Sequence, residues 1–222
     1  MSKILGFLAG TALALSFHSG VQAQEIAPDQ LVQKITEEVL AAIKSDKQLA
    51  AGDKQKALKL AEEKVLPYID FEDATRLAVG RAWAQANPEQ KKRLISEFRN
   101  MLVRTYSNAI EAYQGQTLKV LPSRGNQAEK DEATVRTQFV RAGGQPLPID
   151  FQMHKTEKGW KVFDISVEGV SLVLTYRSEF DAVVKQEGID GLIKRLAQKN
   201  TPAAVGGTAP KSEKSPAKAE KK

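Results

Sequence analysis

The chain changes its hydrophobic period within Gly159-Trp-Lys-Val-Phe-Asp-Ile-Ser-Val-Glu-Gly-Val-Ser-Leu-Val-Leu-Thr-Tyr-Arg-Ser-Glu-Phe180. In its first half, Trp160 and Val162 alternate onto one side of an extended segment, and Phe163, Ile165 and Val167 onto the other. This pattern predicts a central strand, residues 160–167, that is buried on both faces. After the break at residues 168–169, apolar residues recur at steps of three and four, which predicts an amphipathic helix over residues 170–187.

A strand that leads into a helix through one glycine places Val170, Val173 and Leu174 at the end of a sheet. Side chains at such a place either line a cavity or fill a core. Hydrophobic periodicity alone does not distinguish these two arrangements.

Upstream of this stretch the chain has period two and is rich in β-branched residues, which predicts strands at residues 118–121, 133–141 and 147–155. Turns at Gly143-Gly144 and at residues 157–159 connect the last strands into an antiparallel meander. Ile149, Phe151 and Met153 alternate with polar residues, so one face of the sheet is apolar and the other is polar. Together with the helices, this predicts an α+β fold.

The predicted helices carry recognisable start signals. Asp70 is a suitable N-cap, and Asn87-Pro88 followed by Gln90 forms a capping box. Residues 46–53 are a polar linker. The remaining helices are expected at residues 28–45, 54–66, 72–80, 88–113 and 188–199.

Both ends of the chain differ from the expected domain at residues 24–200. Residues 1–23 resemble a cleaved secretory signal peptide, with Lys3 before an apolar run and a predicted cut after Ala23, which indicates export to a periplasm. Residues 201–222 are rich in Lys, Ala and Pro, which predicts a disordered tail. That tail carries much of the net positive charge, so the body shows no basic stripe typical of nucleic-acid binding.

Residues able to support catalysis are few. The chain has no cysteine, and His18 lies in the signal peptide, which leaves His154 on the polar face of its strand as an expected exposed histidine. No metal or cofactor is expected. Alternation places Asp164 on the strand face of Trp160 and Val162, and a meeting with Tyr106 inside the fold would supply an acid and a phenol. A small-molecule isomerase or hydrolase is therefore one alternative. A buried structural Asp164, bonded to a backbone amide or to an arginine, is the other interpretation.

The positive signal is a surplus of large apolar residues expected to point into one space between the sheet and its helices. Such a space would suit an adaptable ligand-binding lining, although an ordinary core, as in a ligand-free partner-docking module, would use the same residues. The candidate lipid-binding residues are Leu77, Phe98, Met101, Leu102, Tyr106, Phe139, Phe151, Met153, Trp160, Val170 and Leu174.

Seven ordered motifs over about residues 30–199 resemble the MlaC family, the periplasmic phospholipid carriers of the Mla pathway that maintains outer-membrane lipid asymmetry, also called toluene-tolerance auxiliary proteins. The motifs are Leu66-Pro-Tyr-Ile-Asp-Phe71, Ala78-Val-Gly80 with Trp83, Arg104-Thr-Tyr106, Gly159-Trp-Lys-Val-Phe-Asp164, Glu168-Gly-Val-Ser-Leu172, Tyr176-Arg177 and Gly188-Ile-Asp-Gly-Leu192.

The resemblance implies a curved antiparallel sheet of about four strands, clasped by N-terminal and C-terminal helices around an apolar cavity for acyl chains. It implies no enzyme activity and no cofactor, with phospholipid as cargo carried by a monomer. The implied partners are an outer-membrane Mla lipoprotein complex and an inner-membrane ABC transporter bearing an MCE-domain protein. Val170 matches the cavity mouth, with Leu172 and Leu174 beside it.

Overall fold

The computed structural model describes residues 26–106, 117–122, 130–140 and 144–201. Its elements follow one another as α1 (Pro28–Ser45), α2 (Lys47–Ala50), α3 (Lys54–Lys64), η1 (Leu66–Tyr68), α4 (Phe71–Val79), η2 (Gly80–Gln85), α5 (Pro88–Tyr106), β1 (Thr117–Val120), β2 (Glu132–Val140), β3 (Leu147–Thr156), β4 (Gly159–Val167), β5 (Val170–Ser171), η4 (Leu174–Tyr176) and α7 (Arg177–Lys199). The predicted signal peptide, the tail after Thr201 and the last part of the helix predicted over residues 88–113 lie outside the described residues.

The strands form one five-stranded sheet in the order β1-β2-β3-β4-β5, and every neighbouring pair is antiparallel. This confirms the α+β class and the predicted meander. The extra strand arises because the chain turns back on itself after β4.

The helix predicted from residue 170 begins later than expected. Glu168 and Gly169 both have positive φ, 51° and 80°, which is the backbone of a two-residue hairpin turn. Val170 and Ser171 therefore pair with Val167 and Ser166 as β5. Helical structure begins only after the hairpin, first as η4 and then as α7.

A β-bulge in β4 changes which side chains share a face of the sheet. Val162 lies opposite Met153 and Asp164 lies opposite Gln152, so Phe163 is the extra residue. Ile165, opposite Phe151, consequently shares a face with Val162. The expected second apolar face is therefore wrong for Ile165 and Val167, which the bulge returns to the face of Val162. Phe163 does lie on the other face, where its ring is 5.4 Å from that of His154.

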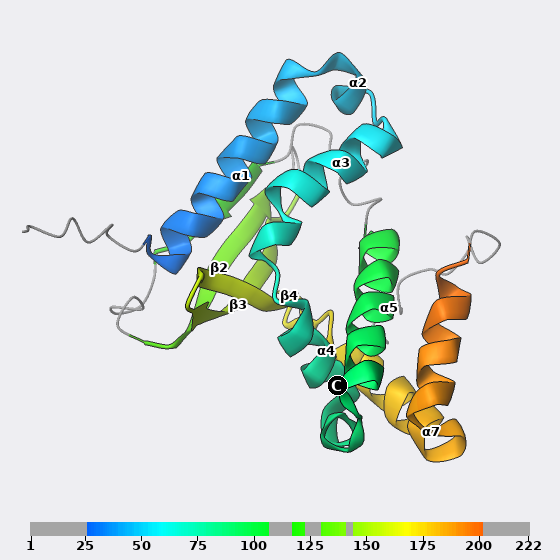
Figure 1. The fold of residues 1–222 in the computed structure, drawn as a ribbon. Coiled ribbons are helices and arrows are strands. Elements are labelled where there is room, and N and C mark those ends of the chain that lie inside the picture. The colour runs from blue at the N-terminus through cyan, green and yellow to red at the C-terminus, as the bar shows by residue number, and fades with distance from the viewer. Residues whose placement is uncertain (1–25, 107–116, 123–129, 141–143, 202–222) are drawn as a thin grey trace, which may run out of the picture.

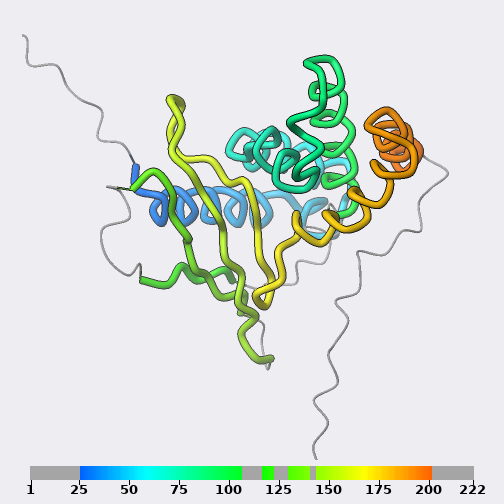
Figure 2. The backbone as a smooth tube through the Cα atoms, turned by 90° about the horizontal axis from the view of Figure 1, so that it is seen from below, coloured from blue at the N-terminus to red at the C-terminus, as the bar shows by residue number. Residues whose placement is uncertain are grey.

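Helix α1 covers part of this apolar face, and Figure 2 shows it running across the strands. Its Leu31 and Val32 are buried together with Met153, Trp160 and Val162 of the sheet. Because α1 covers only one end of the sheet, the apolar face continues beyond it.

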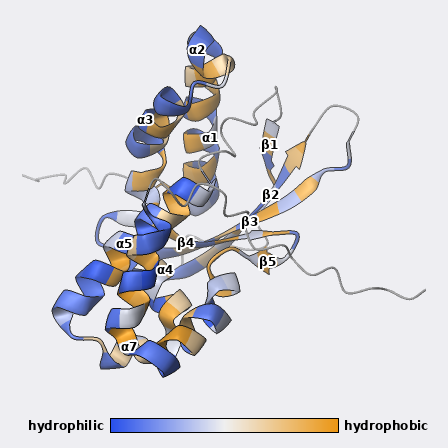
Figure 3. Ribbon diagram, turned by 90° about the vertical axis from the view of Figure 1, so that its right-hand side faces the viewer, coloured by the Kyte–Doolittle hydropathy of each residue, from blue (hydrophilic) through white to orange (hydrophobic). Residues whose placement is uncertain are grey.

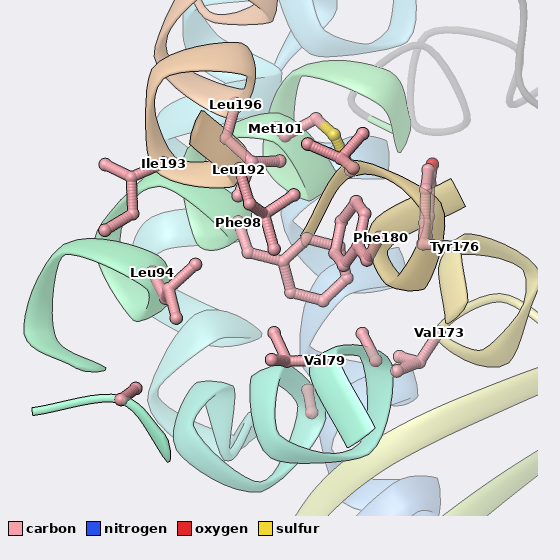
Figure 4. Close-up of a cluster of buried hydrophobic side chains, with 14 residues drawn as sticks. Val79, Leu94, Phe98, Met101, Val173, Tyr176, Phe180, Leu192, Ile193 and Leu196 are labelled. Atoms are coloured by element: carbon pink, nitrogen blue, oxygen red, sulfur yellow. The ribbon is translucent and has the colours of Figure 1, made fainter. Parts of the chain in front are cut away.

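A second core lies among α4, α5 and α7, which form a separate helical group in Figure 1. At its centre, the ring of Phe98 meets those of Tyr176 and Phe180 edge to face, with centroids 5.5 and 5.3 Å apart (Figure 4). Gly188 breaks α7 with a φ of 72° and a ψ of −175°, at the position where the sequence predicts a new helix.

Two predicted helix starts are confirmed by their hydrogen bonds. The Gln90 amide N–H donates to Asn87 Oδ1 at 2.8 Å, and the Asn87 N–H donates to Gln90 Oε1 at 3.1 Å. The Asp73 N–H donates to Oδ1 of the N-cap Asp70 at 2.9 Å. The linker expected at residues 46–53 contains the short helix α2. None of the helices in the described ranges is long and apolar enough to cross a membrane.

Candidate ligand-binding cavity

An apolar cavity of about 430 Å³ lies between the sheet, the α3 helix and the helical group. Its size falls within the range usual for small-molecule sites. The lining is apolar or aromatic except for Asp164. The lining residues are Leu58, Ala61, Val65, Leu66, Ile69, Phe71, Ala74, Leu102, Val103, Tyr106, Ile149, Phe151, Val162, Phe163, Asp164, Ile165, Val167, Leu172 and Val173.

Helix α3 supplies one wall of the cavity. Leu58, Ala61 and Val65 follow one another at helical spacing and face the cavity, while Leu60 is buried. Leu58 nevertheless keeps 37% of its surface exposed, which is typical of a side chain at an opening. Salt bridges from Lys64 to Glu38 at 3.1 Å and from Lys56 to Asp46 at 2.5 Å connect α3 to α1 and to the α1–α2 junction. Figure 3 shows α3 beside α1 and away from the strands.

The opposite wall comes from the helical group. Phe71 and Ala74 of α4 and Leu102, Val103 and Tyr106 of α5 line it. Burial raises the pKa of the Tyr106 phenol above its ordinary value, and the neighbouring phenol of Tyr176 and the carboxylate of Asp164 raise it further. The phenol therefore stays neutral at ordinary pH.

The sheet forms the floor, and the bulge at Phe163 makes that floor continuously apolar. Ile149 and Phe151 of β3 lie opposite Val167 and Ile165 of β4, and all four line the cavity. Without the extra residue, Ile165 and Val167 would point to the polar face of the sheet.

Asp164 reaches the cavity from the other, polar face of β4, where only 5% of its surface is exposed. Its Oδ1 accepts hydrogen bonds from the backbone N–H of Ile165 at 2.8 Å and of Val173 at 3.2 Å. These bonds attach the segment with Leu172 and Val173 to the cavity wall. The backbone-bonded interpretation of Asp164 is confirmed, and its placement on the same face as Val162 is wrong because of the bulge.

His154 is not the exposed histidine that the sequence predicts. Its Nε2 lies 3.0 Å from Asp70 Oδ2 and its Nδ1 lies 3.0 Å from Asp73 Oδ2, and 19% of its side chain is exposed. The start of α4 covers the polar face of the sheet at this point, so the histidine gains two carboxylate partners. Among the described residues, no group of three or more His, Cys, Asp or Glu residues is arranged to hold a metal ion.

Known proteins resemble this chain in sequence and in structure. A profile of the MlaC protein family matches residues 33–198. The chain belongs to the MlaC family. A phospholipid-binding protein from Ralstonia solanacearum, solved with a phospholipid, superposes with a TM-score of 0.72 and 35% sequence identity, over 79% of this chain and 97% of that one.

Curated relatives agree with the assignment to the MlaC family. The intermembrane phospholipid transport system binding protein MlaC of Haemophilus influenzae is 23% identical over 78% of this chain and 82% of its own. The toluene tolerance protein ttg2D of Pseudomonas putida is 23% identical over 73% of this chain and 75% of its own.

The candidate lipid-binding residues do not all point into one space, so that expectation is wrong. Leu102, Tyr106 and Phe151 line the cavity. The helices α4, α5 and α7 bury apolar faces against one another, and α1 covers part of the sheet. The residues taken up by these two cores are Leu77, Phe98 and Met101 in the helical group, and Met153 and Trp160 under α1.

The other three candidates lie outside both cores and outside the cavity lining. Phe139 is half-buried on β2, opposite Leu147. Val170 and Leu174 are 40% and 41% exposed. They flank Leu172 and Val173, which do line the cavity. Their contact with a ligand stays a prediction.

Sequence reasoning missed the lining contributed by α3 and by the second half of β4. The apolar stripe of Leu58, Ala61 and Val65 was visible as helical spacing, but spacing does not show that the stripe faces a cavity. Ile165 and Val167 were visible as apolar residues, and only the bulge reveals which face they occupy.

Proposed function

We propose that this protein is a periplasmic phospholipid carrier that encloses acyl chains in the apolar cavity. The observation that carries the proposal is a cavity of about 430 Å³ with an almost wholly apolar lining. An active site would need several polar or ionisable side chains in its lining. The structural likeness to a phospholipid-bound protein supports the same function.

The energetics of an acyl chain explain why a carrier needs such a cavity. Each buried methylene avoids a cost of about 0.8 kcal/mol in water, so a chain of about 15 carbons avoids roughly 12 kcal/mol. Free diffusion of a phospholipid through water is therefore rare. A lining of Phe151, Ile165 and Leu102 supplies the apolar contacts that replace the membrane interior.

Recognition in this cavity depends on shape and hydrophobic contact. Asp164, the one charged lining residue, already accepts two backbone hydrogen bonds. The head group consequently lies outside the apolar lining, towards solvent, and the carrier tolerates different head groups. The phospholipid is the cargo, and the proposed function needs no cofactor.

The proposed route follows from the family and from the N-terminal sequence. Residues 1–23 direct export and are removed after Ala23, so that the domain of residues 24–200 works in the periplasm as a monomer. It exchanges phospholipid with an outer-membrane Mla lipoprotein complex and with an inner-membrane ABC transporter that carries an MCE-domain protein. The name of the Haemophilus influenzae relative, an intermembrane phospholipid transport protein, supports this route.

Mass spectrometry of an organic extract tests the proposal. Protein purified from its native host should release phospholipid in a fixed ratio to protein. Leu58→Glu places a charge at the cavity wall and should lower the bound phospholipid at least tenfold. Gln55→Glu adds the same charge to an exposed position of α3 outside the cavity and should retain it.

The two variants also separate a lost site from a lost fold. Both should unfold at temperatures close to that of the unchanged protein, since both positions are exposed. Equal phospholipid in the Leu58→Glu and unchanged proteins would contradict the assignment of the cavity. Absence of phospholipid from all three, even after incubation with phospholipid vesicles, would contradict the proposed function.

A further inference from the structure

A second, polar cavity of about 710 Å³ is lined by the end of α4, by the η2 turn that follows it and by the first half of α7. It shares no lining residue with the apolar cavity. Its lining residue Val79 and the buried residues Phe180 and Val183 belong to the helical core. Acyl chains in the first cavity therefore do not account for the second.

Gly80 creates space for a guanidinium group in this polar cavity. It ends α4 with a φ of 64°, which favours glycine. A Cβ atom at this position would lie 2.9 Å from Nη2 and 3.0 Å from Nε of Arg177. The side chain of Arg177 thus lies against the main chain of Gly80, and any other residue at position 80 would displace it.

The charges in the cavity are unbalanced. Arg177, Asp181 and Lys185 follow one another at steps of four along one face of α7. Lys185 Nζ lies 2.6 Å from Asp181 Oδ2, so the carboxylate already has a cation. Arg177 and Arg81 form no ion pair or hydrogen bond with any residue in the described part of the chain. The accessible guanidinium groups of Arg81 and Arg177 therefore carry positive charge that no carboxylate in the cavity lining neutralises.

We propose that this α4–α7 pocket binds a phosphate group. A guanidinium presents parallel N–H donors that match the oxygens of a phosphate, and two of them match its double negative charge. The pocket is larger than a phosphate ion needs, which leaves room for the organic part of a phosphate ester. The phosphate comes either from free phosphate or from a lipid head group on a membrane surface. In the second case the pocket holds the carrier against the membrane.

Calorimetric titration with inorganic phosphate tests the free-ion source. The unchanged protein should bind phosphate, and the double variant Arg81→Gln with Arg177→Gln should bind it at least tenfold more weakly. Arg93→Gln removes an exposed arginine of α5 outside the pocket and should leave the binding unchanged.

Co-sedimentation with vesicles tests the lipid source. The unchanged protein and the Arg93→Gln variant should sediment with vesicles of phosphatidic acid in phosphatidylcholine. The double variant should stay in the supernatant. Phosphatidylcholine alone is the reference, because its choline group covers the phosphate. Retention on the phosphatidic acid vesicles identifies a head-group site, and phosphate binding without that retention identifies a free-phosphate site.

Two results would overturn the proposal. One is the absence of both phosphate and vesicle binding. This result would overturn the proposal even if an acidic peptide bound to the protein. The other is equal weakening by Arg93→Gln and by the double variant, which would indicate general attraction to a positive protein. Phospholipid cargo in the apolar cavity should be the same in all these variants, so this test is independent of the carrier function.

Discussion

The imidazole of His154 on β3 lies against the carboxylate of Asp70, the N-cap of α4, with Nε2 and Oδ2 3.0 Å apart. Asp70 also donates its backbone N–H to the carbonyl of Val162 at 2.8 Å, beside the bulge. One residue thus caps α4, contacts the sheet and holds the histidine. The contact fixes the start of α4, and with it Phe71 and Ala74, at the cavity wall.

Replacing His154 should therefore lower the stability of the fold. We expect His154→Ala to reduce the free energy of unfolding by about 1–3 kcal/mol, because the partly buried Asp70 carboxylate loses its hydrogen-bond partner and Asp73 loses the imidazole beside it. Urea unfolding at neutral pH measures the change. A loss below about 0.5 kcal/mol, the range of ordinary surface substitutions, would show that the contact does not hold α4 in place.

Substitutions of Asp164 test its structural role directly. Asp164→Ala leaves the N–H groups of Ile165 and Val173 without their acceptor and should cost about 2 kcal/mol or more. Asp164→Asn keeps an acceptor oxygen, so it should be closer to the unchanged protein in urea unfolding and should retain bound phospholipid. Loss of phospholipid in a fully folded Asp164→Asn variant would instead indicate that the charge contacts the ligand.

The raised pKa of Tyr106 predicts a loss of stability at alkaline pH. Burial, Tyr176 and Asp164 all disfavour the tyrosinate in the folded protein, whereas an unfolded tyrosine ionises at about pH 10. The stability that the neutral phenol contributes is complete below about pH 10 and is lost as pH rises above that value.

Urea unfolding at pH 8 and pH 11 measures this loss for the unchanged protein and for Tyr106→Phe. The phenylalanine variant cannot ionise at this position, so its stability should fall less between the two pH values. Groups that do not contact Tyr106 are the same in both proteins, so the comparison removes their effect. Equal losses would show that the Tyr106 phenol ionises as easily in the folded state as in the unfolded state.

Much of the fold was predictable because local signals and the final structure agree. The capping box at Asn87 and Gln90 and the alternation of Ile149, Phe151 and Met153 each act over a few residues. Such local signals predict α5 and the central strands of the meander. The break at Gly188 was predictable for the same reason, since positive φ there favours glycine.

The bulge and the hairpin were not predictable, because their sequence patterns have two physical interpretations. Between Val162 and Ile165 the apolar residues change from even-numbered to odd-numbered positions. This change indicates either a strand with two apolar faces or an inserted residue. Likewise, Val170 fits both the start of a helix and a returning strand. The choice depends on the pairing with β3 and on the hydrogen bonds that the Asp164 carboxylate accepts, and the alternation of apolar residues encodes neither.

The cavity itself depends on packing that composition does not encode. Phe98 and Leu102 lie one helical turn apart on α5, yet Phe98 is fully buried in the helical core and Leu102 lines the cavity. Apolar residues with the same period therefore serve either role. Only the placement of α3 at a distance from the sheet leaves part of the apolar surface uncovered.

Photochemical cross-linking tests the central claim most directly. A phospholipid with a diazirine near the end of one acyl chain is loaded into the protein and irradiated, and the modified residues are identified by peptide mass spectrometry. We predict modification within residues 102–106, 149–151 and 162–167, which line the apolar cavity. Modification confined to surface positions, with none of these segments labelled, would contradict the enclosure of acyl chains.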